Sequence, residues 1–412
     1  MKKLITIIII LISGISAVQA QTLDSYLEMA AKNNQGLQSK YKEFEAALQK
    51  IPQVNALPDP SFSFGYFISP VETRVGPQRA KFSLSQMFPW FGTLEAIGDA
   101  AALMAAAKYQ SFLEARNKLW FDVAAAYYPL YELKQIQEIE RKNIDILESY
   151  KTIATGKFGN GAGPMVDVLR VDIMLKDAQT SLEILNKKEH ALVSTFNNLL
   201  NRNEYEDVVV ADTLLASEIE IEAVKDSLLL RNPAINALEL KTRASKANER
   251  VAQKQGLPNI GVGLDYVVVG EPSGMSVADA GKDVLMPMVS VSIPLFRKKY
   301  DAAEKEAQFM QESYALQKEN ALNLLSSEFD RTLFEISQQL DLLKLYREQV
   351  ITTRQSLNLL FSSYGNSGKE FEEVLRMQQK LLQYEKLMAT AMTQYYIATA
   401  KFDFITAKNT NR

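Results

Sequence analysis

The feature that most constrains this chain is an internal repeat that relates its two halves. The segment Phe158-Gly159-Asn160, followed by Val168-Leu169-Arg170, returns 206 residues later as Tyr364-Gly365-Asn366, followed by Val374-Leu375-Arg376. Upstream, Phe88-Pro89-Trp90-Phe91 returns as Ile293-Pro294-Leu295-Phe296. A chain that repeats itself at a fixed spacing builds the same structural unit more than once. We therefore predict one architecture made of two tandem repeats.

Within each repeat the hydrophobic period changes from that of a helix to that of a strand and back. Residues 61–88 and 259–295 alternate large apolar side chains with Ser, Gly or Asp, as strands with one apolar face do. Long helical stretches follow at 93–200 and 297–407, each interrupted by a glycine-containing turn. The predicted fold class is mainly α with a β part: two β-hairpins, hence four strands, and two long coiled-coil helical hairpins per chain.

The repeat also sets the expected domain boundaries. We place the first repeat at 21–204 and the second at 222–412, with an equatorial segment at 205–221 between them. In that segment the run Val208-Val209-Val210 favours a small strand-and-helix belt.

The N-terminus has the three parts of a secretory signal peptide at residues 1–20. Lys2 and Lys3 precede an apolar run, and Val18-Gln19-Ala20 forms a small-residue cleavage site. No other stretch approaches the roughly 18 apolar residues of a membrane helix. The sequence contains no cysteine, so we expect an exported protein without a lipid anchor.

Composition argues against catalysis and against a nucleic-acid partner. The net charge of −3 is close to neutral, whereas nucleic-acid binding needs a basic surface. The only histidine, His190, lies in a charged run, and neither a phosphate-binding loop nor a dinucleotide fingerprint is present. We expect a protein that is not an enzyme and that uses no metal and no cofactor.

Apolar residues at alternating three- and four-residue spacing predict coiled-coil seams in both long helices. In the second they are Phe329, Leu333, Ile336, Leu340, Leu343, Val350 and Leu357, and in the first Ile136, Ile139, Ile146, Tyr150 and Ile153.

The length and the number of the predicted strands indicate an oligomer. Their length is near the roughly 9–11 residues of a membrane strand, and open strand edges are not tolerated in hydrocarbon. Four strands are too few to close a barrel, whereas three chains supply twelve strands around a polar lumen. We therefore expect a homotrimer whose strands lie in outer-membrane lipid. Half-exposed hairpins that cover a soluble core are the alternative.

The two turn segments carry a family resemblance. They read Gly159-Asn160 with Val166-Asp167-Val168-Leu169, and Tyr364-Gly365-Asn366-Ser367-Gly368-Lys369 with Glu373-Val374-Leu375. Together with the repeated order of elements, they resemble the TolC family of outer-membrane efflux channels over essentially the whole mature chain. Leu57-Pro58-Asp59-Pro60 and Ser85-Gln86-Met87-Phe88-Pro89-Trp90-Phe91-Gly92 further resemble the branch that serves heavy-metal cation exporters.

The resemblance implies a trimeric channel in the outer membrane, with a twelve-stranded β-barrel and an α-barrel that extends into the periplasm. It implies two protein partners: a periplasmic adaptor, also called a membrane fusion protein, and an inner-membrane pump of the resistance-nodulation-division type. The entrance or gate candidates are Tyr364, Lys369, Glu370, Glu373 and Asp167. The candidates for the tip turns and adaptor docking are Gly159, Asn160, Gly163, Gly365, Asn366, Gly368, Val168, Leu169, Val374 and Leu375. Asp265 is the candidate in the barrel lumen.

Simpler interpretations stand beside these roles. Glu370, Glu372 and Glu373 are also the acidic residues that a helix dipole favours in a first turn. The glycines also suit the turns, and Asp265 also suits a solvated face. For the whole chain, the expected function is a passive trimeric duct of a tripartite efflux system that carries metal cations or small toxic compounds. The alternative is a secreted periplasmic coiled-coil scaffold or adhesin without channel activity.

Overall fold

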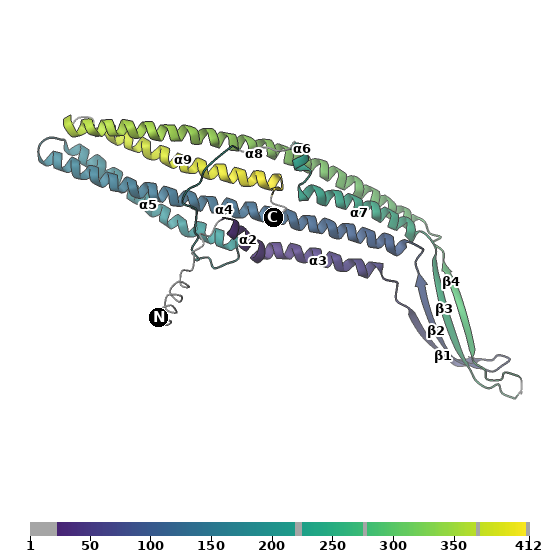
Figure 1. Cartoon of the computed structure of the whole chain (residues 1–412). Helices are drawn as coiled ribbons and strands as arrows, with labels where there is room; N and C mark the ends of the chain where they lie inside the picture. Colours follow the sequence, from purple (N-terminus) through teal and green to yellow (C-terminus); the bar gives the residue numbers. More distant parts are fainter. Residues whose placement is uncertain (1–22, 219–224, 275–277, 368–370, 409–412) are drawn as a thin grey trace, which may run out of the picture. The chain divides into compact units, whose positions relative to one another are not determined.

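The computed structural model describes residues 23–218, 225–274, 278–367 and 371–408. The expected signal peptide lies outside these residues. The helices are α2 (Leu23–Asn33), α3 (Gln35–Asn55), α4 (Thr93–Gly159), α5 (Met165–Leu199), α6 (Lys225–Leu229), α7 (Pro233–Gln255), α8 (Lys298–Ser367) and α9 (Phe371–Ile405), and the strands are β1 (Ser61–Val71), β2 (Gln78–Phe88), β3 (Asn259–Val269) and β4 (Val284–Ser292) (Figure 1). Within the described ranges, no helix is long and apolar enough to cross a membrane. The prediction of a mainly helical chain with a β part is confirmed.

The chain divides into two compact units, and each draws on both halves of the sequence. The helical unit consists of Met1–Ser39, Leu113–Asn232 and Asn323–Arg412, and the sheet unit of Lys40–Phe112 and Pro233–Leu322.

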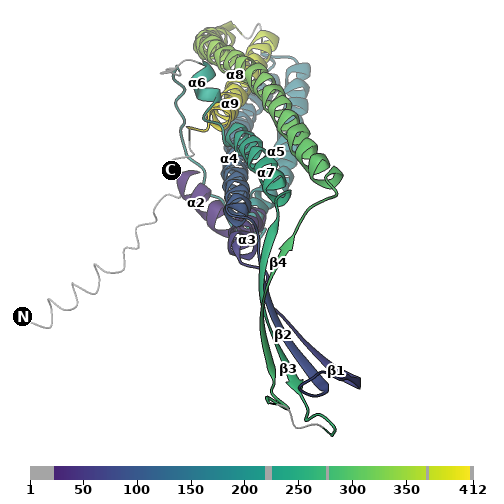
Figure 2. The same cartoon turned by 90° about the vertical axis from the view of Figure 1, so that its right-hand side faces the viewer.

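In the sheet unit, the strands form one antiparallel sheet in the order β1-β2-β3-β4 (Figure 2). β2 pairs with β3, so the two hairpins join into a single surface. Phe64 lies opposite Phe82, which lies opposite Tyr266, and their rings follow one another across the sheet at 5.0 Å and 6.4 Å. The same pairing places Ser83 opposite Asp265 on the other face, because neighbouring side chains in a strand alternate between faces.

The face that carries this aromatic row exposes many large apolar side chains. They are Phe62, Phe64, Tyr66, Leu84, Val262, Leu264, Tyr266, Leu285, Val289 and Val291. An apolar surface of this kind marks an interaction site with a membrane or a protein partner.

The loops of the two hairpins are bonded to each other. The Gly270 amide donates to the Pro77 carbonyl, and the Gly281 amide donates to the Val75 carbonyl, both at 2.7 Å. Gly76 has φ +129°, and a Cβ there would lie 1.8 Å from the Gly270 carbonyl oxygen. Only glycine fits this close approach.

In the helical unit, α8 packs with the predicted seven-residue repeat. Phe329, Ile336, Leu343, Val350 and Leu357 are all buried, and Tyr364 continues the series. The C-terminal part of this seam, from Val350 to Tyr364, belongs to a cluster of apolar side chains from α4, α5, α8 and α9. Six buried positions at one spacing are the signature of coiled-coil packing.

In α4 the predicted seam was wrong. Ile146 and Ile153 are exposed, whereas Leu133, Leu147 and Ala154 are buried. The buried stripe of α4 is therefore rotated about the helix axis, away from the stripe of isoleucines that was predicted. Of the predicted residues only Tyr150 is fully in the core.

Polar side chains that have partners explain this rotation. Gln137, Glu140 and Asn143 are buried in the same stripe of α4. Glu140 forms an ion pair with Lys386 of α9, and Asn143 accepts a hydrogen bond of 3.1 Å from Gln378. Because each of these side chains has a polar partner on another helix, its burial does not carry the full cost of desolvation.

The segment before α6 corrects a second expectation. Val208-Val209-Val210 forms no strand. Instead, the Val209 amide donates to the Tyr26 hydroxyl and the Ala211 amide to the Tyr127 hydroxyl. Tyrosine side chains thus take the place that a neighbouring strand would occupy.

Candidate functional site

The first helical hairpin turns at residues 159–164, and its geometry depends on one glycine. The Ala162 amide donates to the Lys157 carbonyl at 2.8 Å, and the Gly161 amide donates to the Phe158 carbonyl at 3.0 Å. This is the Schellman arrangement, which requires a left-handed residue after the helix. Gly161 supplies it, with φ +70°. α5 then begins after Pro164 in extended conformation.

The predicted turn residues surround this glycine. Gly159 is the last residue of α4, and a Cβ there would meet nothing within 4 Å. Gly163 is tighter, since a Cβ would lie 3.3 Å from the Lys157 Cβ. Asn160 is exposed, and its amide donates to the Gly156 carbonyl at 3.2 Å.

The second turn is described only at its two ends. α8 continues through Gly365 and Asn366 to Ser367, and α9 begins at Phe371. Gly368, Lys369 and Glu370 lie outside the described residues.

Tyr364 is buried at the end of α8, with 1% of its surface exposed. Its ring stacks on Phe371 at 4.4 Å between centroids, and the Lys157 ammonium lies 4.5 Å above the ring. Lys157 also donates to the Tyr364 carbonyl at 2.8 Å. A cation over an aromatic face is attracted by its quadrupole, so this lysine connects the two turns.

Charged side chains connect α5 to α9 beside these rings. Arg170 lies 3.6 Å from Asp167 on its own helix and 3.0 Å from Glu372 on α9. Arg376 lies 3.1 Å from Glu373. Asp167 is buried, whereas Glu373 is about half exposed. Arg170 is therefore the charged link between α5 and α9, the two helices that follow the turns and that we call the return helices.

Burial changes the titration of two groups at this site. It raises the pKa of the Asp167 carboxyl, against the effect of Arg170, which lowers it, and the negative charge of Glu372 raises it further. It also raises the pKa of the Tyr364 hydroxyl, with a further contribution from Asp167. The Tyr364 hydroxyl is buried and has no hydrogen-bond partner among the described residues.

The apolar candidates divide between core and surface. Val168, Val374 and Leu375 are buried in the cluster that joins the four long helices, whereas Leu169 is exposed. The first three thus pack together the helix ends next to the two turns, which we call the tip, whereas Leu169 faces solvent.

Asp265 lies in the sheet unit. It is fully buried in β3 and forms an ion pair with Lys81 of β2, on the face that carries the serines and glycines. The structure brings the tip candidates together and keeps Asp265 in a different unit.

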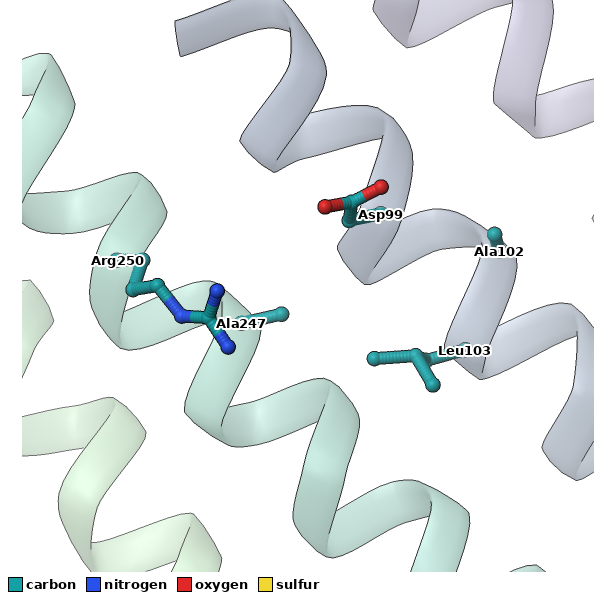
Figure 3. Close-up of a pocket in the computed structure, with 5 residues that line it drawn as sticks. All are labelled: Asp99, Ala102, Leu103, Ala247 and Arg250. Atoms are coloured by element: carbon teal, nitrogen blue, oxygen red, sulfur yellow. The ribbon is translucent and has the colours of Figure 1, made fainter. Parts of the chain in front are cut away.

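Other residues line two hollows, one in each unit. Figure 3 shows one of about 360 Å³, where Asp99, Ala102 and Leu103 of α4 face Ala247 and Arg250 of α7. The other, about 880 Å³, lies in the helical unit between α2, α4 and α9, with Trp120 and Tyr128 in its wall. In the described ranges, no three His, Asp or Glu side chains gather as metal ligands would.

Sequence analysis missed three residues that shape the tip: Gly161, Lys157 and Arg170. Gly161 lies between the two glycines that were singled out, and its positive φ is a backbone property that its neighbours do not reveal. Arg170 was visible as part of the repeated Val-Leu-Arg motif, which could have identified it. Lys157 gave no signal.

Comparison with known sequences finds a family match over the second half of the chain and a longer alignment with one related protein. Residues 224–407 match the outer membrane efflux protein family. The outer membrane efflux protein BepC of Brucella suis biovar 1 (strain 1330) is 22% identical over 287 residues, which cover 68% of this chain and 62% of BepC. The match thus spans less than two thirds of that relative.

Comparison with solved structures extends over nearly the whole chain. CusC aligns with a TM-score of 0.78 at 14% identity, covering 94% of this chain and 92% of CusC. The outer membrane protein VceC of Vibrio cholerae aligns with a TM-score of 0.73 at 15% identity, covering 93% and 95%. The CmeC outer membrane channel of Campylobacter jejuni gives 0.74 at 15%, covering 94% and 88%. At these identities the likeness establishes the fold.

Proposed function

We propose, from the premise that this chain belongs to the outer membrane efflux protein family, that it is the outer-membrane channel of a tripartite efflux system. The observation that carries the proposal is the sheet. One of its faces exposes a band of aromatic and aliphatic side chains, while the other carries Ser63, Ser83, Gly263 and Asp265. A surface that is apolar outside and polar inside suits a wall between lipid and a water-filled lumen.

The edges of the sheet support a trimer. β1 and β4 are the outer strands, and in hydrocarbon their unpaired backbone groups would each cost several kcal/mol. Pairing β1 of one copy with β4 of the next removes every edge when the ring closes. Three copies give twelve strands, enough to leave a lumen.

The helices support the same closure. α5 exposes Leu169, Ile173 and Ile184, and α8 exposes Leu345 and Leu359. Ile173 lies about two turns from the start of α5, and Leu359 about two turns from the end of α8. Within a copy, α4 contacts α5 and α9, and α9 contacts α8. The exposed apolar residues of α5 in one copy would thus pack against those of α8 in the next copy. Such pairing is expected because the two halves of the chain are repeats of one structural unit.

At the tips, we assign the entrance to the cluster around Tyr364. Glu373 is half exposed and suits a ring of carboxylates that attracts cations. Asp167, Arg170 and Glu372 connect the return helices and would hold the entrance closed. Lys369 and Glu370, outside the described residues, belong to this entrance in the proposal.

The partners and the cargo follow from the same assignment. The exposed Leu169 and Asn160 are the described tip residues offered to the periplasmic adaptor, and an inner-membrane pump of the resistance-nodulation-division type would supply the cargo. We propose metal cations or small toxic compounds as substrates. The chain would lie in the outer membrane and extend into the periplasm, after removal of residues 1–20.

Cell fractionation and planar-bilayer recording test this function. We expect a detergent-extracted trimer from the outer membrane that forms channels of low closed-state conductance. A soluble monomer recovered from the periplasm would overturn the proposal in favour of a scaffold.

Single substitutions then test the entrance. Glu373→Ala should lower cation selectivity, because it removes an exposed charge from each copy. Asp167→Ala should raise the conductance of the closed channel, because its carboxylate packs between Arg170 and the core. Asp177→Ala, an exposed carboxylate of α5, is the matched control. Unchanged recordings from both tip variants would remove these carboxylates from the mechanism.

A further inference from the structure

Where the strands meet the helices, large apolar side chains lie next to a run of basic ones. Phe91, Leu295 and Phe296 are 78%, 77% and 86% exposed. Phe91 follows the end of β2, and Leu295 and Phe296 follow the end of β4. Arg297, Lys298 and Lys299 come directly after Phe296, and all three are exposed. We call these six residues the rim patch.

Contacts within the sheet unit bring the two parts of the rim patch to one place. The Lys254 ammonium donates to the Phe91 carbonyl at 3.4 Å, and Arg297 donates to the Gly256 carbonyl at 3.0 Å. Both exits from the sheet therefore flank the short connection from α7 to β3. The rim patch is also continuous with the exposed apolar face, since β2 and β4 end in it.

Helix stability does not account for the basic run. α8 begins at Lys298, so Lys298 and Lys299 lie in its first turn, where the helix dipole disfavours positive charge. At the equivalent place in the first repeat, α4 begins at Thr93 and has Glu95 in its first turn, as the dipole favours. Asp301 offsets only one of the three charges of the run. The Lys299 ammonium also lies 4.7 Å from the centroid of the Tyr300 ring, which lies beside it in the chain. The run therefore carries more positive charge than the start of its own helix favours.

We infer that the rim patch binds the headgroups of anionic phospholipids in the periplasm-facing leaflet of the outer membrane. This inference rests on the proposed membrane sheet. Aromatic side chains concentrate at membrane interfaces, and lysines or arginines beside them attract anionic lipid. Phe91, Leu295 and Phe296 enter the interface, and Lys298 and Lys299 reach the phosphates. The sheet thereby gains a fixed depth in the membrane at its helical end.

Trp90 provides a reporter beside the patch. The chain has two tryptophans, and Trp90 precedes Phe91, with its ring 6.0 Å from the Phe91 ring. Trp120→Phe leaves Trp90 as the only emitter. The protein is reconstituted into phosphatidylcholine vesicles that contain an equal mole fraction of either brominated phosphatidylcholine or brominated phosphatidylglycerol, and the quenching of Trp90 is compared.

We expect several-fold stronger quenching by the brominated phosphatidylglycerol, falling as salt screens the charges. Lys298→Gln with Lys299→Gln should remove the preference while quenching by either lipid persists. Lys187→Gln with Lys188→Gln, an exposed pair on α5, makes the same charge change and should leave the preference intact.

The outcomes separate this inference from the proposed function. Equal quenching by the two lipids in the unsubstituted patch overturns the anionic-lipid site and leaves the membrane sheet in place. A preference that survives Lys298→Gln with Lys299→Gln also overturns it. Absence of quenching by either lipid overturns the membrane sheet itself, and the lipid site with it.

Discussion

Replacing Lys386 by methionine should cost the helical unit more stability than replacing Glu140 by glutamine, although both changes remove the same ion pair. The difference comes from burial. The Glu140 side chain is 2% exposed, whereas that of Lys386 is 32% exposed. Lys386→Met leaves a carboxylate inside the α4 stripe without its counter-charge. Glu140→Gln leaves an ammonium that already reaches water and keeps a polar group opposite it.

The magnitudes follow from this asymmetry. Removing one partner of a buried pair costs about 3–5 kcal/mol, and we expect Lys386→Met to fall near 3 kcal/mol because water reaches the site along the lysine. Glu140→Gln should cost about 1.5 kcal/mol, the lower end of the range for a hydrogen bond to a charged group, because the amide keeps an acceptor opposite the ammonium. The double variant has no uncompensated charge and should lose about 1–2 kcal/mol, well below the sum of the singles.

Denaturant unfolding of the detergent-solubilised protein, followed by far-ultraviolet circular dichroism, measures these losses. Glu183→Gln and Lys187→Met, in an exposed pair on α5, are the controls and should have little effect. Equal losses for the two single variants, or a double variant that loses their sum, would refute the reasoning from burial.

Two further predictions concern the tip. Burial raises the pKa of Asp167, so the stability that its neutral form provides is present below the unfolded-state pKa of about 3.9 and is lost as pH rises through the folded-state value. Asp167→Asn should therefore stabilise the protein more at about pH 7 than at about pH 4, as read from melting temperatures; a larger gain in acid would mean that Arg170 controls the carboxylate. Gly161→Ala should destabilise by about 1 kcal/mol because φ is positive there, whereas Gly159→Ala should be neutral or slightly stabilising. Similar effects of the two alanines in thermal unfolding would contradict the Schellman assignment.

The sequence predicts α8 well because one stripe on that helix is apolar at every seventh position from Phe329 to Leu357. Phe329, Ile336 and Leu343 are buried where the pattern puts them. On α4 the isoleucines form one stripe and a mixed polar and apolar set forms another. Burial follows the mixed stripe because Glu140 and Asn143 find partners on α9. Hydrophobicity along one helix contains no information about polar partners on another.

At the tip, the sequence predicts a break between the two long helices of the first repeat, and the structure has it after Gly159, but the sequence leaves the internal geometry of the turn open. Tyr364 and Asp167 lie close enough to interact, which their places beside the two repeated turns can suggest. Their burial, and the link through Arg170 from α5 to α9, depend on how the return helices approach each other. The presence of several glycines also does not show which one adopts the left-handed conformation: of the glycines between 156 and 163, only Gly161 has a positive φ.

Hydrogen bonds to its backbone attach the segment from 205 to 218 to the helices. Phenol groups of Tyr26, Tyr127, Tyr395 and Tyr396 bind its amides and carbonyls at Val209, Ala211, Leu215 and Ser217. Every residue except proline offers the same amide, so these contacts do not depend on which side chains the segment carries; buried Val210 and Asp212, which pairs with Lys134, are the side chains that add to them. Natural variation should therefore accumulate in this segment while the tyrosines stay fixed. The exposed Leu215 is accordingly a convenient position for a spectroscopic label or an affinity tag on an otherwise tightly packed helical unit.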